Sequence, residues 1–190
     1  MRRSYFEDLY GEDPDPWGLA TRCYEARKYA LTVAALPHSR YRSGFEPGCS
    51  IGVLSRLLAA RCEHLLAVDG IPAAAEQARA RTAGLANVEV AELTVPEDWP
   101  ETTFDLVVLS EVAYYFDREE LGELLGRVHR TLEAGGTLMA VHWRGPTNYP
   151  LTGDQAHRLI GARPELSRLV HHVEDDFILE AWVHGTAPQG

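Results

Sequence analysis

The chain has 190 residues, which suits one α/β domain, and it carries a formal net charge of −10. This acidity argues against a nucleic-acid partner, because basic contacts to phosphates supply most of the affinity for nucleic acids. No apolar run is long enough for a transmembrane helix or a secretory signal, so we expect no membrane partner and a cytoplasmic protein. A small molecule, neutral or cationic, is the favoured partner, and the oligomeric state stays open.

The spacing of cysteine and histidine residues argues against a metal site. The three cysteines, Cys23, Cys49 and Cys62, are odd in number and lack CxxC spacing. The eight histidines are scattered along the chain, and the adjacent pair His171 and His172 would face opposite sides of a strand. We therefore expect neither a metal ion nor a disulfide framework.

The N-terminal part is expected to differ from the rest of the chain. Residues 7–18 are acidic and contain two prolines, which indicates an irregular lead-in. Residues 18–36 contain helix formers, and Pro37 ends the predicted helix. We interpret residues 1–37 as a helical lid or substrate segment that precedes a core of residues 42–184.

Strands and helices alternate through the core. The first strand is predicted to end near Glu46. Further strands are predicted over residues 64–69, 88–92, 104–110, 137–143, 167–173 and 177–184. Helices are predicted over residues 51–61, 72–83, 117–133 and 152–162, and the pair Gly135-Gly136 is expected to stop the third of them. The pattern predicts one α/β domain over residues 1–190, with a doubly wound, seven-stranded, mostly parallel sheet and a C-terminal antiparallel hairpin.

Ligands of such sheets bind beyond the carboxyl ends of the strands. The first predicted strand ends in the segment Glu46-Pro47-Gly48-Cys49-Ser50-Ile51-Gly52. This segment is a glycine-containing turn that leads into a helix with free N–H groups. The second ends at Asp69, whose carboxylate can accept both hydrogen bonds of a ribose diol. Either feature alone also fits a plain turn or a helix cap. Together they favour an adenosine-type ligand.

A dinucleotide fingerprint fails at this turn. Counted from Gly48, it needs glycines at positions 50 and 53, where the chain has Ser50 and Val53. An NAD-linked oxidoreductase is therefore disfavoured.

The ordered set of segments resembles the class I methyltransferases that use S-adenosylmethionine (SAM). Glu46–Gly52 looks like their motif E/D-x-G-x-G-x-G with Ser50 at the middle glycine, and Val68-Asp69 is similar to their second motif. Residues 104–111 look like the fourth motif, and residues 132–138 resemble L-x-P-G-G-x-L with alanine in place of proline. The resemblance implies a Rossmann-like methyltransferase fold, SAM as cofactor and S-adenosylhomocysteine (SAH) as product.

A narrower resemblance links the chain to the rhizobial nodulation protein S family. It is carried by Asp15-Pro16-Trp17, by Tyr24-Glu25-x-x-Lys28-Tyr29, by Glu46-Pro47-Gly48-Cys49 and by Ser110-Glu111-x-x-Tyr114-Tyr115. Members of that family N-methylate the amine of a deacetylated chitooligosaccharide. The resemblance thus implies an amine acceptor, sugar-derived or other.

The candidate site residues follow from these segments. The expected cofactor-binding residues are Trp17, Arg27, Glu46, Gly48, Cys49, Ser50, Gly52, Asp69, Gly70, Glu92, Leu93 and Ser110. The expected substrate residues are Tyr24, Tyr114 and Tyr115, because aromatic rings bind sugar faces and cations. The expected catalytic residues are Glu111 and His142, which end two central strands.

Structural alternatives stay open for several of these residues. His142 also fits a packed, hydrogen-bonded histidine, and Glu111 also fits a helix-start carboxylate. Tyr24 fits core packing, and Arg27 fits a solvated side chain.

The expected function is transfer of a methyl group from SAM to an amine or hydroxyl of a small polar acceptor. The substitution at Ser50 leaves open a non-catalytic methyltransferase-like module that binds a nucleotide or a partner. The acceptor, the choice between nitrogen and oxygen, and the general base are not determined by the sequence.

Overall fold

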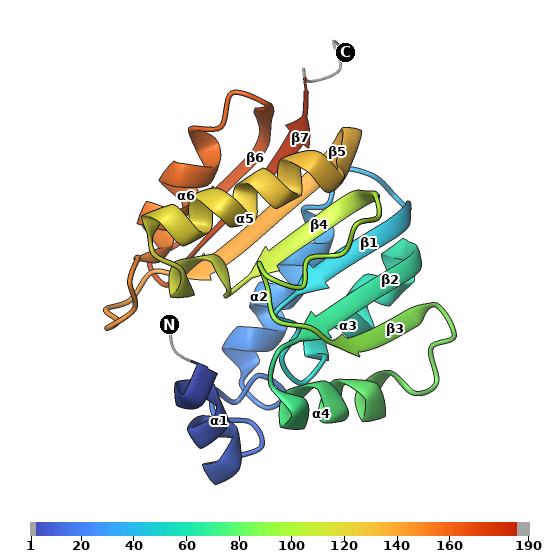
Figure 1. Ribbon diagram of the computed structural model, residues 1–190, viewed down its shortest axis with the longest axis vertical. Helices are drawn as coiled ribbons and strands as arrows, with labels where there is room; N and C mark the ends of the chain where they lie inside the picture. The colour runs from blue at the N-terminus through green and yellow to red at the C-terminus, as the bar shows by residue number, and fades with distance from the viewer. Residues whose placement is uncertain (1–2, 186–190) are drawn as a thin grey trace.

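The computed structural model describes residues 3–185, and its centre is a seven-stranded sheet of order β3-β2-β1-β4-β5-β7-β6 (Figure 1). The first five strands are parallel, and β7 runs antiparallel to both of its neighbours. The strands are β1 (Tyr41–Pro47), β2 (Cys62–Asp69), β3 (Val88–Glu92), β4 (Phe104–Ser110), β5 (Leu132–Trp143), β6 (Leu166–Val173) and β7 (Phe177–His184). The predicted doubly wound fold with its antiparallel hairpin is confirmed.

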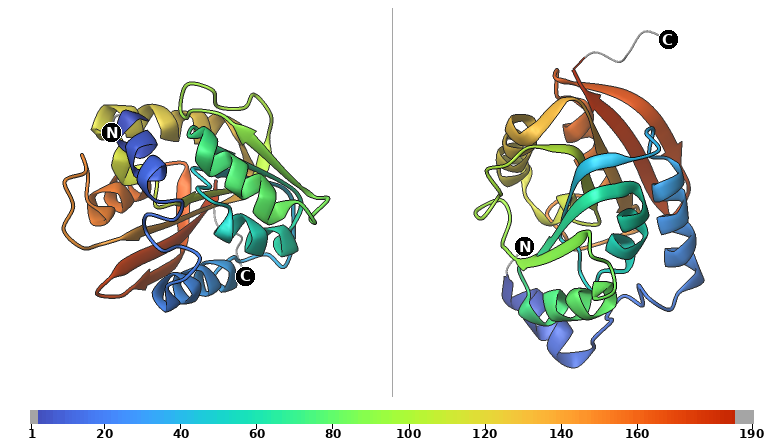
Figure 2. Two further views of the ribbon diagram at one scale, coloured as in Figure 1. Left: turned by 90° about the horizontal axis from the view of Figure 1, so that it is seen from below. Right: turned by 90° about the vertical axis from the view of Figure 1, so that its right-hand side faces the viewer.

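Helices cover both faces of this sheet (Figures 1 and 2). The helices α2 (Cys23–Ala34) and α3 (Val53–Leu58) lie on one face, and α5 (Arg118–Thr131) and α6 (Gly153–Gly161) lie on the other. The helix α4 (Pro72–Thr82) packs beside β3 and α3. Among residues 3–185, no helix combines the length and the apolar character that crossing a membrane requires.

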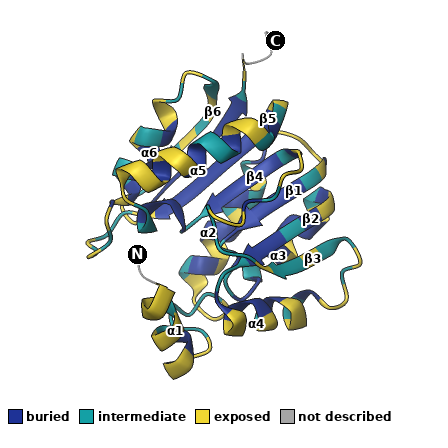
Figure 3. Ribbon diagram, in the orientation of Figure 1, coloured by how far each residue is buried: buried dark blue, intermediate teal, exposed yellow. Residues whose placement is uncertain are grey.

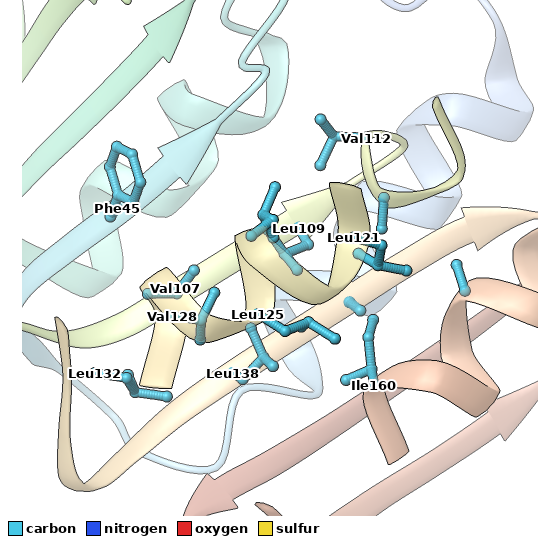
Figure 4. Packing of buried hydrophobic residues seen from close by; sticks show 14 of the residues in the cluster. Phe45, Val107, Leu109, Val112, Leu121, Leu125, Val128, Leu132, Leu138 and Ile160 are labelled. Carbon is cyan, nitrogen blue, oxygen red and sulfur yellow. The ribbon is translucent and has the colours of Figure 1, made fainter. Parts of the chain in front are cut away.

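The alternating side chains of β4 divide the core into two halves. Val107 and Leu109 pack under α5 and α6, in a cluster that includes Leu121 and Ile160 (Figure 4). Leu106 and Val108 face the opposite way, toward the side chains of α2 and α3. Burial is therefore continuous through the middle of the sheet, as expected for a parallel sheet covered on both faces (Figure 3).

The helix α5 begins at a capping box, but it ends before the glycine pair that was expected to stop it. Asp117 accepts hydrogen bonds from the N–H groups of Glu119 and Glu120, and the Glu120 carboxylate accepts one from the N–H of Asp117, forming a capping box. The helix ends at Thr131, before Gly135-Gly136, so the prediction that these glycines stop it is wrong. Both glycines lie inside β5, where its register with β4 shifts. Phe104 pairs with Leu132 and Leu106 pairs with Thr137, so β5 has extra residues between the two pairs.

The N-terminal part contains more structure than predicted, because a helix α1 (Arg3–Glu12) occupies much of the expected irregular lead-in. Phe6 and Tyr10 lie one turn apart on this helix and pack with Trp17 and Ile71. The tertiary contacts therefore stabilise a short helix that its acidic composition does not indicate.

Two other predicted helices begin later than expected. The helix predicted from residue 18 begins at Cys23, because Gly18 has a positive φ of 68° and the chain then turns. The helix predicted over 51–61 is α3, which follows Gly52 at φ 75°, and a 3₁₀ turn η1 (Ala59–Arg61).

Candidate active site

A cavity of about 900 Å³ lies at the carboxyl ends of the central strands. Its wall includes residues at or next to the carboxyl ends of three neighbouring parallel strands, namely Glu46 of β1, Asp69 of β2 and Ser110 of β4. The N-terminal helix α1 contributes further wall residues, and it lies off this edge of the sheet (Figure 1). The cavity is thus where the topology of a doubly wound sheet places a ligand.

The turn after β1 depends on two glycines. Gly48 and Gly52 have positive φ angles of 73° and 75°, a conformation that other residues rarely adopt. A Cβ on Gly48 would lie 3.0 Å from the Val112 side chain, and one on Gly52 would lie 2.9 Å from the Ala78 backbone. These glycines therefore let the turn pass close to its neighbours.

Asp69 joins this turn to the end of β2. Its carboxylate accepts a hydrogen bond from the N–H of Ser50 at 2.8 Å and one from the N–H of Ile71 at 2.9 Å. Each carboxylate oxygen can accept a second hydrogen bond from a ligand in the cavity. Asp69 therefore has both the position and the acceptor capacity to hold a pair of ligand hydroxyls.

Glu46 presents a buried carboxylate to the same cavity. Its residue is 2% exposed, and Oε2 has no hydrogen-bond partner within residues 3–185. Burial raises the pKa of Glu46 to about 8. A buried carboxyl group in a cavity wall with a free oxygen suits a ligand that brings a positive charge or an N–H donor.

A second cluster of charged groups surrounds Glu111. Lys28 donates to Oε1 of Glu111 at 2.5 Å, while the Tyr114 hydroxyl and the Trp143 N–H donate to Oε2 at 2.6 and 2.9 Å. Glu111 has a positive φ of 54°, a strained conformation for glutamate that these contacts help to hold. The carboxylate is thereby fixed at the cavity wall, where it is in part exposed.

Lys28 links α2 to this cluster. Its ammonium lies 2.9 Å from Glu25 Oε2 and 5.0 Å from the centre of the Tyr24 ring, and the residue is 1% exposed. Burial alone would lower the pKa of Lys28, but Glu111 and Glu25 outweigh it and raise the pKa above its usual value. One cation is therefore buried between two carboxylates, which leaves negative charge at this end of the cavity.

Aromatic rings line the part of the cavity next to Glu111. The centre of the Tyr115 ring lies 4.8 Å from Tyr114, 4.7 Å from Tyr149 and 4.8 Å from Phe6. Tyr114 and Tyr115 both belong to the 3₁₀ turn η2 (Ala113–Tyr115), and both line the cavity. The wall is thus apolar and aromatic beside its charged groups.

Carboxylates outnumber basic side chains along the cavity wall. The acidic residues are Glu25, Glu46, Asp69, Glu97, Glu111, Glu120, Glu123 and Asp176, and the basic residues are Arg3, Arg22 and Lys28. This excess of negative charge favours a cationic ligand.

Most of the residues expected from the sequence lie together in this cavity wall. They are Trp17, Tyr24, Glu46, Gly48, Cys49, Ser50, Asp69, Gly70, Leu93, Ser110, Glu111, Tyr114 and Tyr115. Gly52 is not part of the cavity wall, but its positive φ shapes the turn whose residues Gly48, Cys49 and Ser50 belong to the wall.

Three expected residues point elsewhere. Arg27 is exposed and forms an ion pair with Glu174 at 2.7 Å, and Glu92 lies outside the cavity wall, 3.9 Å from Arg3. His142 is fully buried behind the wall, where both of its ring nitrogens have hydrogen-bond partners. An imidazole held in this way cannot reach an acceptor, so we do not retain His142 as a catalytic base.

Sequence reasoning missed several wall residues. Glu25 lies three positions before Lys28 on α2, a spacing that places both on one helix face and could have identified it. Lys28 was expected either to reach the cofactor carboxylate or to be solvated, and it is instead buried between Glu25 and Glu111. Tyr10 donates or accepts a 2.5 Å hydrogen bond with Ser50 across 40 positions of sequence. Such a contact has no local signal in the sequence.

The seven-stranded sheet and the cavity at the carboxyl ends of its strands are those of the Rossmann-like methyltransferase fold. The sequence profile of the nodulation protein S (NodS) family matches residues 7–144, and the chain belongs to this family.

Relatives and solved structures agree with this assignment. A nodulation protein S of Rhizobium tropici is 31% identical over 127 residues, which are 66% of this chain and 53% of that protein. One of Bradyrhizobium diazoefficiens is 33% identical over 102 residues, 53% of this chain and 49% of that protein. The matched segments span about half the length of these relatives.

Two solved structures have the same fold. A Pseudomonas syringae protein described as a methyltransferase is 42% identical, with a TM-score of 0.76 over 86% of this chain and 100% of that chain. The N-methyltransferase NodS of Bradyrhizobium japonicum in complex with SAH has a TM-score of 0.84 over 95% of this chain and 97% of that chain, at 22% identity.

Proposed function

We propose that this protein transfers the methyl group of SAM to an amine of a small polar acceptor. The observation that carries the proposal is the fixed Glu111 carboxylate beside Lys28, in the same acidic cavity as Glu46 and Asp69. One half of the cavity suits the cofactor, and the other half suits a cationic or amine acceptor.

The cofactor half offers a partner for each polar part of SAM. The free oxygen of Glu46 would accept from the methionine ammonium, and Asp69 would accept from the ribose hydroxyls. The turn from Gly48 to Gly52 would bring backbone N–H groups toward the methionine carboxylate, and Leu93 would lie against adenine. These residues fit the cofactor by charge and by donor type.

The acceptor half supplies electrostatic stabilisation. SAM would supply an electrophilic methyl group on its sulfonium sulfur. The lone pair of the acceptor nitrogen would form the new N–C bond in line as the S–C bond breaks, which releases neutral SAH. Positive charge then grows on the acceptor nitrogen, and the Glu111 carboxylate stabilises that charge while it orients the N–H groups. Lys28 and Tyr114 hold Glu111 in place for this purpose, and the amine must enter in its neutral form.

The aromatic residues favour an acceptor with a ring face. Tyr114, Tyr115 and Tyr149 form a continuous aromatic surface near Glu111, and such surfaces bind sugar rings as well as cations. The relatives that match this chain are nodulation proteins, and one solved relative is called an N-methyltransferase. These points support an amino sugar as the first acceptor to test.

The test is methyl transfer from labelled SAM to a panel of small amines and matched alcohols, with an amino sugar included. We expect transfer to amines and not to alcohols, and the Glu111→Gln variant should lower kcat/KM by roughly 100-fold without loss of SAH binding. The matched control is Glu174→Gln, a carboxylate that pairs with Arg27 outside the cavity. Transfer to alcohols alone, or full activity in Glu111→Gln, would contradict the proposal.

A further inference from the structure

Behind the cavity wall, three buried side chains from three elements form one hydrogen-bonded row. They are His142 of β5, His157 of α6 and Glu180 of β7, each no more than 3% exposed. His142 Nδ1 lies 3.0 Å from His157 Nε2, and His157 Nδ1 lies 2.8 Å from Glu180 Oε2. At the other end, His142 Nε2 accepts from the N–H of Ala113 at 3.0 Å.

The chemistry of these groups determines where each proton lies. The Ala113 N–H can only donate, so His142 Nε2 carries a lone pair and His142 Nδ1 carries the proton. His157 Nε2 must then accept, and His157 Nδ1–H donates to the Glu180 carboxylate. Both imidazoles are therefore neutral and in the Nδ1–H form, and every hydrogen bond in the row has one direction.

The row ends at the acceptor half of the cavity. Ala113 begins η2, and the next residue is Tyr114, whose ring centre lies 5.0 Å from that of His142. The Tyr114 hydroxyl donates to Glu111 at 2.6 Å. The position of Glu111 therefore depends on η2, and η2 is held from behind by His142.

The far end of the row is anchored near the surface. Glu180 Oε1 accepts from Arg168 at 2.8 Å and from His171 at 2.6 Å. Burial alone would raise the pKa of Glu180, but His157, His171 and Arg168 outweigh it and hold that pKa below its usual value. The carboxylate stays ionised, and a stable acceptor ends the row.

We propose that His142, His157 and Glu180 are positioning residues, which hold η2 and through Tyr114 orient Glu111 toward the acceptor. The proposal rests on the methyltransferase function proposed above. It assigns His142 a role one step removed from the acceptor, in place of the role of a base.

The first test reads the tautomers without any substrate. Nitrogen-15 NMR of the imidazoles in the wild-type protein should show His142 and His157 neutral, with the proton on Nδ1 in both. A charged His142, or an Nε2–H form of it, would overturn the proposal. The NMR measurement needs no substrate and can be made even if the protein methylates no amine. A failure of the proposed function is therefore distinguishable from a failure of the positioning role.

The second test compares two substitutions of His142. In His142→Gln the side-chain oxygen can still accept from the Ala113 N–H, whereas in His142→Leu it cannot. We expect His142→Leu to lower kcat by about 10- to 100-fold, with SAH affinity unchanged, and His142→Gln to restore most of that loss. Equal losses in the two variants, or a loss confined to SAH affinity, would overturn the positioning role. If His142→Leu does not fold, the wild-type tautomers still test the hydrogen-bonded row on which the positioning role depends.

Discussion

Single residues in the proposed cofactor half of the cavity affect the stability of the fold and also line the cavity. Asp69 holds the turn after β1 by accepting from Ser50, and Glu46 is a buried wall residue whose Oε2 has no hydrogen-bond partner among the described residues 3–185. A substitution at either site changes folding and binding together. A test of function must therefore be paired with a control that changes folding alone.

Asp69→Ala should weaken SAH binding by roughly 1.5–3 kcal/mol, because it removes a charged acceptor of two ligand hydroxyls. Calorimetric titration measures this change. The matched control is Asp105→Ala, since Asp105 also accepts from two backbone N–H groups, those of Arg42 and Ser43, but lies outside the cavity wall. Equal losses of affinity in both variants would contradict a ribose-binding role for Asp69.

Glu46 should make the stability of the free protein fall as the pH rises. Its folded pKa of about 8 lies above the ordinary value of 4.5, so between these values the folded state keeps a proton that the unfolded state has lost. Glu46→Gln should remove this slope and be more stable than wild type near pH 8, on the order of a few kcal/mol. Denaturant unfolding across the window measures both effects.

The same proton gives a binding signal. Pairing with the methionine ammonium favours ionised Glu46, so SAH binding near neutral pH should release a proton in wild type and none in Glu46→Gln. Calorimetry in two buffers of different ionisation enthalpy detects the release. Glu174→Gln is the control, because ion pairing lowers the pKa of Glu174 to about 2 and its effect lies below this window. A wild-type protein that releases no proton would argue against the pairing.

At the scale of elements, α1 lines part of the cavity and lies largely where the sequence pattern predicts an irregular lead-in. The helix α1 packs Phe6 and Tyr10 against Trp17 and Ile71, and its Tyr10 hydroxyl bonds to Ser50 in the turn after β1. Ser50 stands where the methyltransferase motif has its middle glycine. Its hydroxyl thus connects α1 to the turn, a contact that glycine could not make.

Tyr10→Phe should weaken SAH binding by about 0.5–1.5 kcal/mol, because it removes the hydroxyl contact while keeping the ring packing. The matched control is Tyr41→Phe, which removes a hydroxyl bonded to Thr137 outside the cavity wall. The control should lower stability and leave SAH affinity unchanged. Unchanged SAH affinity in Tyr10→Phe would show that the α1 contact does not support the cofactor turn.

At the scale of the whole molecule, charge decides which partners are excluded. The net charge is −10, and acidic residues dominate the cavity wall as well as the composition. A polyanion is repelled by both, whereas a cationic cofactor and an amine acceptor are attracted.

We therefore expect no specific binding to duplex DNA or to RNA at physiological ionic strength. Fluorescence anisotropy with labelled oligonucleotides measures this, and repeating it at low salt provides the control. Saturable binding that weakens steeply with salt would reveal a basic surface that the composition does not suggest.

The sequence by itself determined the layered fold and the cofactor half of the candidate site. Strand periodicity, the glycines around Gly48 and the acid at Asp69 are local features, and in a doubly wound sheet the carboxyl ends of parallel strands meet at one edge. Hence residues expected from motifs lie together in the cavity. The helix α1 was missed because it depends on tertiary packing and its sequence has little helix propensity of its own.

Only the tertiary structure decided the acceptor half. Lys28 and Glu111 are 83 positions apart, and their ion pair arises because α2 folds back over the end of β4. His142 lies near the carboxyl end of a central strand as predicted, but Ala113 and His157 already bond its two ring nitrogens, and Glu180 of β7 bonds His157 in turn. Local patterns report which face of an element is apolar, whereas the partner of a buried polar group depends on which distant elements pack against it.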